Sequence, residues 1–350
     1  MSSPEPTAGE ILDPVTQFSI IVISYKSVDR LKTCLESLRG QSWSAFETIV
    51  VNNDPGEQDA FDAIARTFGD SRFSFHSLPH NPGFAGGVNR GAERASRSWI
   101  ATLNPDAYPN RDWLAQAAAT IDAGGPDITM VASVQVQLTY SHRLDGAGDC
   151  FAPFGLAWRG GHGHKLPRLT GDVPVFAPCG AAAFYRRDAF DEVGGYCERF
   201  FCYFEDVDLA LRLHLRGGRC LLSTQATVKH EGGVSSGGTR SAFAVRQGMR
   251  NMPQTFLRCM PLALLLPMLP FHIIMLSALL LHHAVRGRGT AALGGLAEAI
   301  GAIPAALSER RAIQRDRAVP LGSLAVVMSW NPFDALFRRT AASLRDANSG

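Results

Sequence analysis

The chain has 350 residues, 46% of them apolar, and a formal net charge of +2. This composition predicts a folded protein with one large domain and an appendage, and it argues against a disordered chain. The small net charge also gives no bulk attraction for a polyanion, so we expect no nucleic-acid partner.

The first 17 residues, MSSPEPTAGEILDPVTQ, are polar and carry two acidic residues before Ile11. They lack the basic region and the apolar stretch of a signal peptide, so we expect a flexible leader over residues 1–17. The seven cysteines contain no CxxC pair, a pattern that fits a reducing compartment better than a disulfide framework.

Strand-like and helix-like patterns alternate over the first hundred residues or so. The run FSIIVIS (18–24) is typical of a strand buried on both faces. Further strands are predicted at FETIVV (46–51), RFSFHSL (72–78) and SWIATL (98–103), and then, less regularly, at ITMVASVQVQL (128–138) and GAAAFYRR (180–187). Helical patterns separate the first four, the last of them at 88–96 after a glycine-rich loop. This order predicts a parallel sheet with helices on both faces.

Polar motifs follow these strands, where ligands bind in such folds. They are ISYKS (23–27), VNND (51–54), NPGFAGGVNRG (81–91) and LNPDAYP (103–109). Asp106 in the last motif could cap the next helix or hold a divalent cation on a diphosphate. The glycine-rich motif is no GxGxxG fingerprint; it could bind phosphate at a helix N-terminus or serve tight packing.

Two other sets of polar residues also allow both a ligand-binding and a structural interpretation. Asn52, Asn53 and Asp54 could accept hydrogen bonds from a base imide or a ribose hydroxyl, or simply form a turn. His230 becomes a metal or phosphate ligand only if the fold returns it to the crevice; otherwise it is structural.

The stretch RFFCYFEDVDLALRLHLRGG (199–218) places three acids at the start of an apolar helix. Asp208 and Arg212 are four residues apart, which predicts a structural pair on the helix surface. The helix dipole would favour one acid in the first turn. It does not explain both Glu205 and Asp206 beside four aromatic residues, whose apolar bulk should raise a carboxyl pKa toward the range of a general base.

No charged residue occurs between Arg258 and Arg286, and most of this gap is apolar. Prolines 261, 267 and 270 should break or kink a helix there, and the uninterrupted remainder, 271–285, is short for a membrane span. We expect segment 259–285 to lie in a membrane interface, with a true span or a core helix as alternatives. Basic residues after it, including those of SERRAIQRDR (308–317), would face anionic headgroups.

Taken together, CGAAAFYRRDAFDEVGGYCERFFCYFEDVDLALRLHLRGG, NPGFAGGVNRG, LNPD and the His-x-x-Gly-x-Ser of His230, Gly233 and Ser235 resemble the family 2 glycosyltransferases. These are inverting enzymes of the GT-A fold, and the likeness is greatest to their bacterial rhamnosyltransferase-like branch. The resemblance covers residues 18–235. It implies an α/β fold with a Rossmann-like mixed sheet flanked by helices.

The resemblance also implies a domain plan. Residues 18–238 would form the catalytic domain, with a nucleotide-sugar-binding half (18–106) and an acceptor half (107–238). Residues 239–350 would form a helical, membrane-associating region.

The same resemblance implies roles for individual residues. Asp206 would be the general base, and Glu205 would position it or the acceptor. Asp106 would hold Mg²⁺ or Mn²⁺ against the donor diphosphate, with His230 closing the site over the metal. The remaining donor-binding residues would be Ser24, Tyr25, Asn52 and Asp54 at the nucleotide, and Asn89 and Arg90 near the phosphates and sugar.

Two positions depart from the family pattern, because Asn52 and Cys197 stand where aspartate is usual. The neutral Asn52 could weaken pyrimidine recognition or share it with Asp54, and Cys197 puts a local loop contact in doubt.

The expected activity is inverting transfer of a sugar, L-rhamnose from dTDP-L-rhamnose, to a hydroxyl of a lipid-linked or cell-surface glycan. The protein would act at the cytoplasmic side of the inner membrane, peripheral or monotopic.

The same fold could use UDP-galactofuranose, UDP-glucose or UDP-GlcNAc instead. A non-catalytic, membrane-docked nucleotide-sugar-binding module is the other alternative. A nucleotidyltransferase would want a glycine-rich basic loop after the first strand, which is absent from ISYKSVDRL.

Overall fold

The computed structural model describes residues 16–166, 171–232 and 241–340. Most of the expected leader, and Gly233 and Ser235, lie outside the described residues. The first half alternates strands and helices, as the sequence predicts. Its elements are β1 (Phe18–Ser24), α1 (Val28–Arg39), β2 (Phe46–Asn52), η1 (Pro55–Glu57), α2 (Gln58–Phe68), β3 (Phe73–Ser77), α3 (Gly83–Ala92), β4 (Trp99–Leu103), β5 (Ala107–Pro109), α4 (Trp113–Gly124), β6 (Ile128–Gln137) and β7 (Leu144–Ala147).

The second half is less regular before it becomes helical. Its elements are β8 (Asp149–Phe151), β9 (Ala157–Arg159), β10 (Val173–Val175), β11 (Ala182–Arg186), α5 (Arg187–Glu192), η2 (Glu198–Phe200), α6 (Glu205–Leu215), β12 (Arg219–His230), α7 (Ala242–Cys259), α8 (Leu262–Ala284), α9 (Gly289–Gly301), α10 (Ile303–Arg315), α11 (Leu321–Val327) and α12 (Pro332–Leu336).

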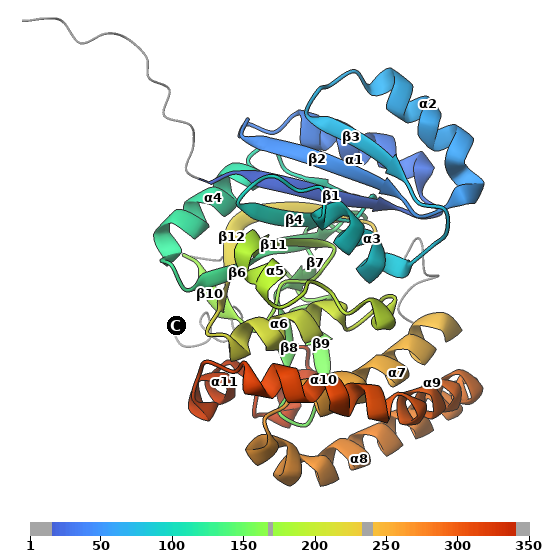
Figure 1. Cartoon of the computed structure of the whole chain (residues 1–350), viewed down its shortest axis with the longest axis vertical. Helices are drawn as coiled ribbons and strands as arrows, with labels where there is room; N and C mark the ends of the chain where they lie inside the picture. The colour runs from blue at the N-terminus through green and yellow to red at the C-terminus, as the bar shows by residue number, and fades with distance from the viewer. Residues whose placement is uncertain (1–15, 167–170, 233–240, 341–350) are drawn as a thin grey trace, which may run out of the picture.

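One mixed sheet organises the molecule, with eight strands in the order β10-β12-β6-β11-β4-β1-β2-β3 (Figure 1). β1 to β4 run parallel, and β11 is antiparallel to both of its neighbours, β4 and β6. Two short strands attach to the far half: β5 pairs with β12, and β7 with β6. Because β12 ends at His230 opposite Ala107, this pairing carries a late segment of the chain back to the end of β4.

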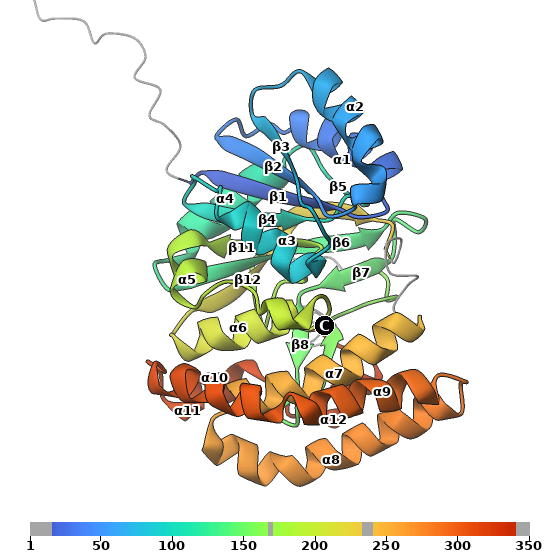
Figure 2. The ribbon, with the colours of Figure 1, turned by 45° about the vertical axis from the view of Figure 1, so that its right-hand side comes forward.

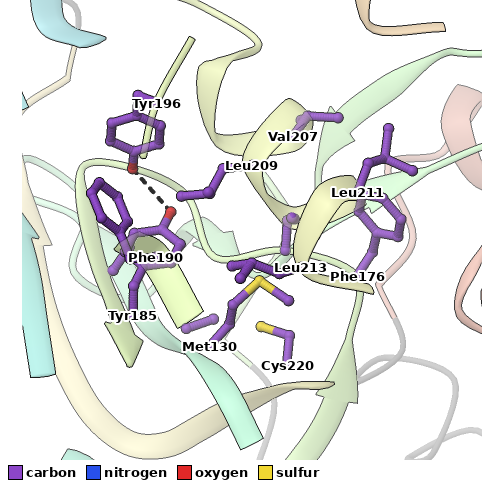
Figure 3. Close-up of a cluster of buried hydrophobic side chains, with 14 of the residues drawn as sticks. Met130, Phe176, Tyr185, Phe190, Tyr196, Val207, Leu209, Leu211, Leu213 and Cys220 are labelled. Atoms are coloured by element: carbon purple, nitrogen blue, oxygen red, sulfur yellow. Dashed lines mark hydrogen bonds between the residues drawn. The ribbon is translucent and has the colours of Figure 1, made fainter. Parts of the chain in front are cut away.

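Both faces of the sheet are covered, so its central strands β1, β4 and β6 are buried along almost their whole length. The cluster on one face includes buried residues of α1, α2 and α4, and the cluster on the other includes α3, α5 and α6. Figure 3 shows the second cluster beneath α6, where Val207, Leu209, Leu211 and Leu213 project into the core. At its edge the hydroxyl of Tyr196 lies 3.0 Å from that of Tyr185, so two buried phenols satisfy each other.

The glycine-rich motif is helical, so the expected loop with a helix only from residue 88 is wrong. α3 begins at Gly83. Close packing explains the glycines: a Cβ at Gly91 would lie 2.5 Å from Cγ2 of Ile21, and one at Gly87 would lie 2.7 Å from Nδ2 of Asn53. The packing interpretation therefore accounts for this motif, since a larger residue would push α3 away from β1 and β2.

The C-terminal helices α7 to α12 gather beyond α6, at the end of the molecule opposite α2 (Figures 1 and 2). α8 is one continuous helix of 23 residues, so the expected break at Pro267 and Pro270 does not occur. Each proline removes only one i→i−4 hydrogen bond, and the remaining backbone bonds keep the helix continuous. α8 is long and apolar enough to cross a membrane, with a mean hydropathy of 2.3.

Candidate active site

The predicted nucleotide-binding residues lie at the adjacent ends of β1 and β2. Ser24 is paired with Asn52 in the sheet register, and the amide of Asn53 donates to the carbonyl of Ser24 over 2.8 Å. The Asn52 side chain closes the turn: its Oδ1 accepts from the amide of Asp54 at 2.9 Å, and its Nδ2 donates to Gln58. Its role in base recognition stays a prediction.

The neighbouring polar side chains also make hydrogen bonds within their own turns. Asp54 caps η1, with Oδ1 accepting from the amide of Gly56 at 2.9 Å. Ser24 is buried, with its Oγ 3.5 Å from that of Ser27, which also accepts from the half-buried Tyr25 amide. The structure thus brings together the four residues predicted for the nucleotide.

Asp106 and His230 meet although they are far apart in the sequence. Both side chains are buried, and His230 Nε2 lies 3.4 Å from Asp106 Oδ1. On its other side His230 Nδ1 is 2.7 Å from Oδ2 of Asp145. The fold therefore returns His230 to Asp106 after β4, and its role as a metal or phosphate ligand stays a prediction.

Asp145 was not predicted from the sequence, yet it fixes the imidazole. A carboxylate only accepts hydrogen bonds, so Nδ1 of His230 is the donor to Asp145, and Nε2 is the nitrogen that a metal could bind once it carries no proton. Burial opposes ionisation of Asp145, but hydrogen bonds from His162 and His230 and the charge of Arg159 hold its pKa well below the usual range. No local signal marks Asp145, because its role depends on the pairing of β7 with β6.

The side chains of Asp106 and His230 together offer ligand atoms that suit a divalent cation. Nε2 of His230 is buried without a hydrogen-bond partner among the described residues, and it faces the Asp106 carboxylate. Burial lowers the pKa of His230, but hydrogen bonds with Asp106 and Asp145 raise it overall, so in the absence of a metal a proton on Nε2 lies between His230 and Asp106. A divalent cation would take the place of that proton. A histidine that donates its other nitrogen to a carboxylate is typical of metal ligation.

The two acids Glu205 and Asp206 begin α6. Asp206 is half-buried; its Oδ2 accepts from the amide of Gly180 at 3.1 Å and its Oδ1 from that of Val207 at 2.9 Å. Glu205 is buried, and its Oε2 has no hydrogen-bond partner among the described residues. Burial raises the pKa of both carboxyls, and the charge of Asp206 raises that of Glu205 further. The expected direction of the pKa shift is confirmed.

Two further groups lie beside Asp206, and sequence reasoning missed both. Asp149, Cys179 and Asp206 place one ligand atom each within 4.8 Å of one another. Asp149 is buried, and burial together with the charge of Asp206 raises its pKa well above the usual value. Asp149 stands in none of the motifs, and Cys179 opens the run CGAAAFYRR without having been assigned a role.

Asp208 is structural, as expected, but its predicted place on the helix surface is wrong. It is fully buried and accepts from Arg212 at 2.9 Å and from Arg258 of α7 at 2.6 Å. The i,i+4 spacing predicted the first partner. The second could not be predicted, because α7 packs on α6 from elsewhere in the chain.

Asn89 and Arg90 lie on α3, away from the strand ends. Asn89 exchanges hydrogen bonds with the backbone of Tyr196, its Nδ2 donating at 2.9 Å and its Oδ1 accepting at 2.9 Å. Arg90 pairs with Glu93 and, at 3.6 Å, with Glu198. These contacts join α3 to the segment before α6, and a donor-binding role for either residue stays a prediction.

Comparison with known proteins decides the family. A model described as glycosyl transferase family 2 matches residues 19–194. The chain belongs to glycosyl transferase family 2. The O-antigen biosynthesis protein RfbC of Myxococcus xanthus is 27% identical over 254 residues, which cover 67% of this chain and 19% of RfbC. The chain likewise spans less than half the length of two other relatives: 40% of the glycosyltransferase AglE of Haloferax volcanii and 34% of the succinoglycan biosynthesis protein ExoO of Rhizobium meliloti.

Solved structures establish the fold of this family 2 member. The mannosyltransferase PcManGT from Pyrobaculum calidifontis, in complex with GDP-Man and Mn²⁺, has a TM-score of 0.51 at 16% identity, covering 96% of this chain and 88% of that one. GalNAc-T7 with UDP, GalNAc and Mn²⁺ has a TM-score of 0.53 at 15% identity, covering 67% and 48%. The expected GT-A fold is confirmed.

Proposed function

We propose that the protein transfers a sugar from a nucleotide donor to an acceptor hydroxyl with inversion at the anomeric carbon. The observation that carries this proposal is the half-buried Asp206 at the start of α6, with a raised pKa, in a family 2 glycosyltransferase. Its hydrogen-bond donor, Gly180, is next to Ala181, whose carbonyl accepts from Asn104 at the end of β4. Asp206 therefore lies close to the strand end that carries Asp106.

Asp206 acts as the general base. It takes the proton of the acceptor hydroxyl while that oxygen bonds to the anomeric carbon from the face opposite the nucleotide, and the bond to the diphosphate breaks. The amides of Gly180 and Val207 hold the carboxylate in one orientation. Glu205, behind it, positions the base or the acceptor.

Asp106 and His230 would hold Mg²⁺ or Mn²⁺, with Asp145 fixing the imidazole. When bound, the metal supplies charge stabilisation for the departing diphosphate. Two structural neighbours contain Mn²⁺ together with a nucleotide or nucleotide sugar, which supports a divalent cation as the cofactor.

The proposed donor is dTDP-L-rhamnose, on the resemblance to the rhamnosyltransferase-like branch. Ser24, Tyr25, Asn52 and Asp54 would line the nucleotide, and Asn89 and Arg90 the phosphates and sugar. The acceptor would be a lipid-linked or cell-surface glycan, a class suggested by relatives named for O-antigen and succinoglycan biosynthesis. UDP-galactofuranose, UDP-glucose and UDP-GlcNAc are the alternative donors.

The helical region, residues 239–350, would attach the enzyme to the cytoplasmic side of the inner membrane, as a peripheral or monotopic protein. Only 11% of the most apolar window of α8 is buried, which does not fit a core helix. Ile274 and Leu281 are each 65% exposed. A groove of about 500 Å³ beside the start of α8 contains Arg311 and Arg317, which suits anionic headgroups.

A donor panel tests the proposal. Purified protein is incubated with a membrane lipid extract and dTDP-L-rhamnose or one of the UDP-sugars, with Mn²⁺, with Mg²⁺ or with chelator. We expect metal-dependent release of nucleoside diphosphate from dTDP-L-rhamnose alone. Release from another donor would overturn the rhamnose assignment. No release and no donor-dependent thermal stabilisation would overturn the transferase itself.

A further inference from the structure

The segment that leads into the catalytic acids has an unusual backbone. Phe201 has φ 63° and ψ −64°, and the amide of Cys202 donates to the carbonyl of Phe200 at 2.7 Å, which makes a γ-turn with positive φ. Tyr203 and Phe204 also have φ of 68°. Non-glycine residues in such conformations are strained, and they persist where the surroundings impose them, often at functional sites. Glu205 and Asp206 follow directly.

A single side chain of the C-terminal region holds this turn. Asn251 of α7 is fully buried, and the two hydrogens of its Nδ2 serve three carbonyls, those of Phe200 at 3.0 Å, Cys202 at 3.0 Å and Tyr203 at 2.8 Å, so that one hydrogen is shared. An amide flip would bring Oδ1 against three carbonyl oxygens, so the network fixes which atom is the nitrogen. We name residues 200–204, with these three carbonyls, the aromatic turn.

The aromatic turn also contacts α3. The amide of Ala85 in α3 donates to the carbonyl of Phe201 at 3.1 Å. A Cβ at Gly83 would lie 2.4 Å from the same oxygen, so glycine is required there. The aromatic turn is therefore packed between α3 and the acids of α6.

Asn251 acts on the aromatic turn and not on the body of α6. The body is joined to α7 separately, through the ion pair of Arg258 with Asp208 at 2.6 Å. Loss of the Asn251 amide would leave this ion pair in place and release only the backbone before Glu205.

We propose that Asn251 is a positioning residue that holds the aromatic turn and thereby sets Glu205 and Asp206 in the active site. α7 then completes a site whose acids all come from the preceding part of the chain. This inference rests on the proposed function, because the acids it positions are the proposed catalytic pair.

The test compares Asn251→Leu, Asn251→Ser and a control, Met249→Ala. Met249 is equally buried on α7 but packs with Val245 and Ala292, away from the aromatic turn. Each protein is assayed for kcat and KM, for donor affinity by calorimetry, and for hydrogen–deuterium exchange over residues 200–206, at the same interval below its own Tm.

We expect Asn251→Leu to lower kcat about 100-fold, the scale of a small displacement of reacting groups, with donor affinity unchanged. Exchange over 200–206 should rise. Asn251→Ser keeps one donor and should fall between Asn251→Leu and the wild type, and Met249→Ala should change Tm but neither kcat nor this exchange.

Equal loss of kcat in Asn251→Leu and Met249→Ala would overturn the inference, as would unchanged exchange over 200–206. If the wild type transfers no sugar, the proposed function fails, and the exchange measurement alone decides whether Asn251 holds the turn. If Asn251→Leu does not fold, Asn251→Ser is compared with the wild type and Met249→Ala by the same two measurements, kcat and exchange over 200–206.

Discussion

At the residue scale, the two acids proposed for catalysis, Glu205 and Asp206, lie in an environment that raises their pKa and costs stability. Glu205 is buried beside Asp206, and its Oε2 lacks a hydrogen-bond partner among the described residues. An ionised carboxylate in that position is costly, which is why burial and the charge of Asp206 raise its pKa. The folded protein therefore binds this proton more tightly than the unfolded chain does.

The change Glu205→Gln should raise Tm at neutral pH while lowering turnover. Because the folded pKa is raised, the wild type loses stability relative to the variant as pH rises from the ordinary carboxyl range toward that raised pKa. Below that range both side chains are neutral and the difference vanishes. We expect Tm to rise by about 1–3 °C at pH 7.5, measured by calorimetry from pH 4 to 8. A variant less stable than the wild type at pH 7.5 would contradict this account.

The residue scale is also where sequence reasoning had mixed success. Asp106, His230, Glu205 and Asp206 could be proposed from the sequence, because each stands in a motif at the end or start of a predicted element, and their roles stay predictions. Asp145 and Asn251 were missed, because each contacts a partner brought to it by the fold. These contacts depend on strand pairing and helix packing, which no local pattern encodes.

At the element scale, α3 shows why a glycine-rich stretch need not be a loop. The prediction of β1 at residues 18–24 was correct, since a short run rich in β-branched residues is typical of a strand buried on both faces. The start of α3 was missed because glycine is a poor helix former, and the packing that requires it depends on Ile21 and Asn53.

Gly91→Ala should destabilise the fold, since its Cβ would lie 2.5 Å from Ile21. Overpacking of this kind costs about 1–3 kcal/mol. Gly248→Ala in α7 is the control, because nothing lies within 4 Å of its Cβ position; there alanine should stabilise by about 0.5–1 kcal/mol. Urea unfolding measures both. Equal effects of the two substitutions would mean that α3 is not packed as described.

At the scale of the whole molecule, a catalytic sheet is joined to a helical region with an uncovered apolar helix. The sequence predicted the apolar segment, and the chain is interrupted at Pro261, between α7 and α8. Pro267 and Pro270 do not break α8, because each proline costs one hydrogen bond in a helix that is otherwise continuous. Exposed Ile274 and Leu281 on α8 and the arginines of the adjoining groove together suit an anionic membrane surface.

Vesicle flotation tests the attachment. We expect binding to vesicles that contain phosphatidylglycerol, weakened about tenfold by Ile274→Asp through lost apolar burial. Arg311→Glu with Arg317→Glu should weaken binding to anionic vesicles and reduce its dependence on salt. Leu138→Asp, at an exposed position outside the helical region, is the control. Equal binding by all variants would show that α8 does not face the membrane.

Asp206 is proposed as the general base of a glycosyl transfer, and the turnover of Asp206→Asn, measured together with its affinity for the sugar donor, tests this role. Asp188→Asn, an exposed acid on α5, is the matched control. We predict that Asp206→Asn lowers kcat by about 10²–10⁴ while donor affinity is retained, because the amide keeps the shape of the carboxylate but cannot accept the proton. Turnover equal to that of the wild type would contradict the account.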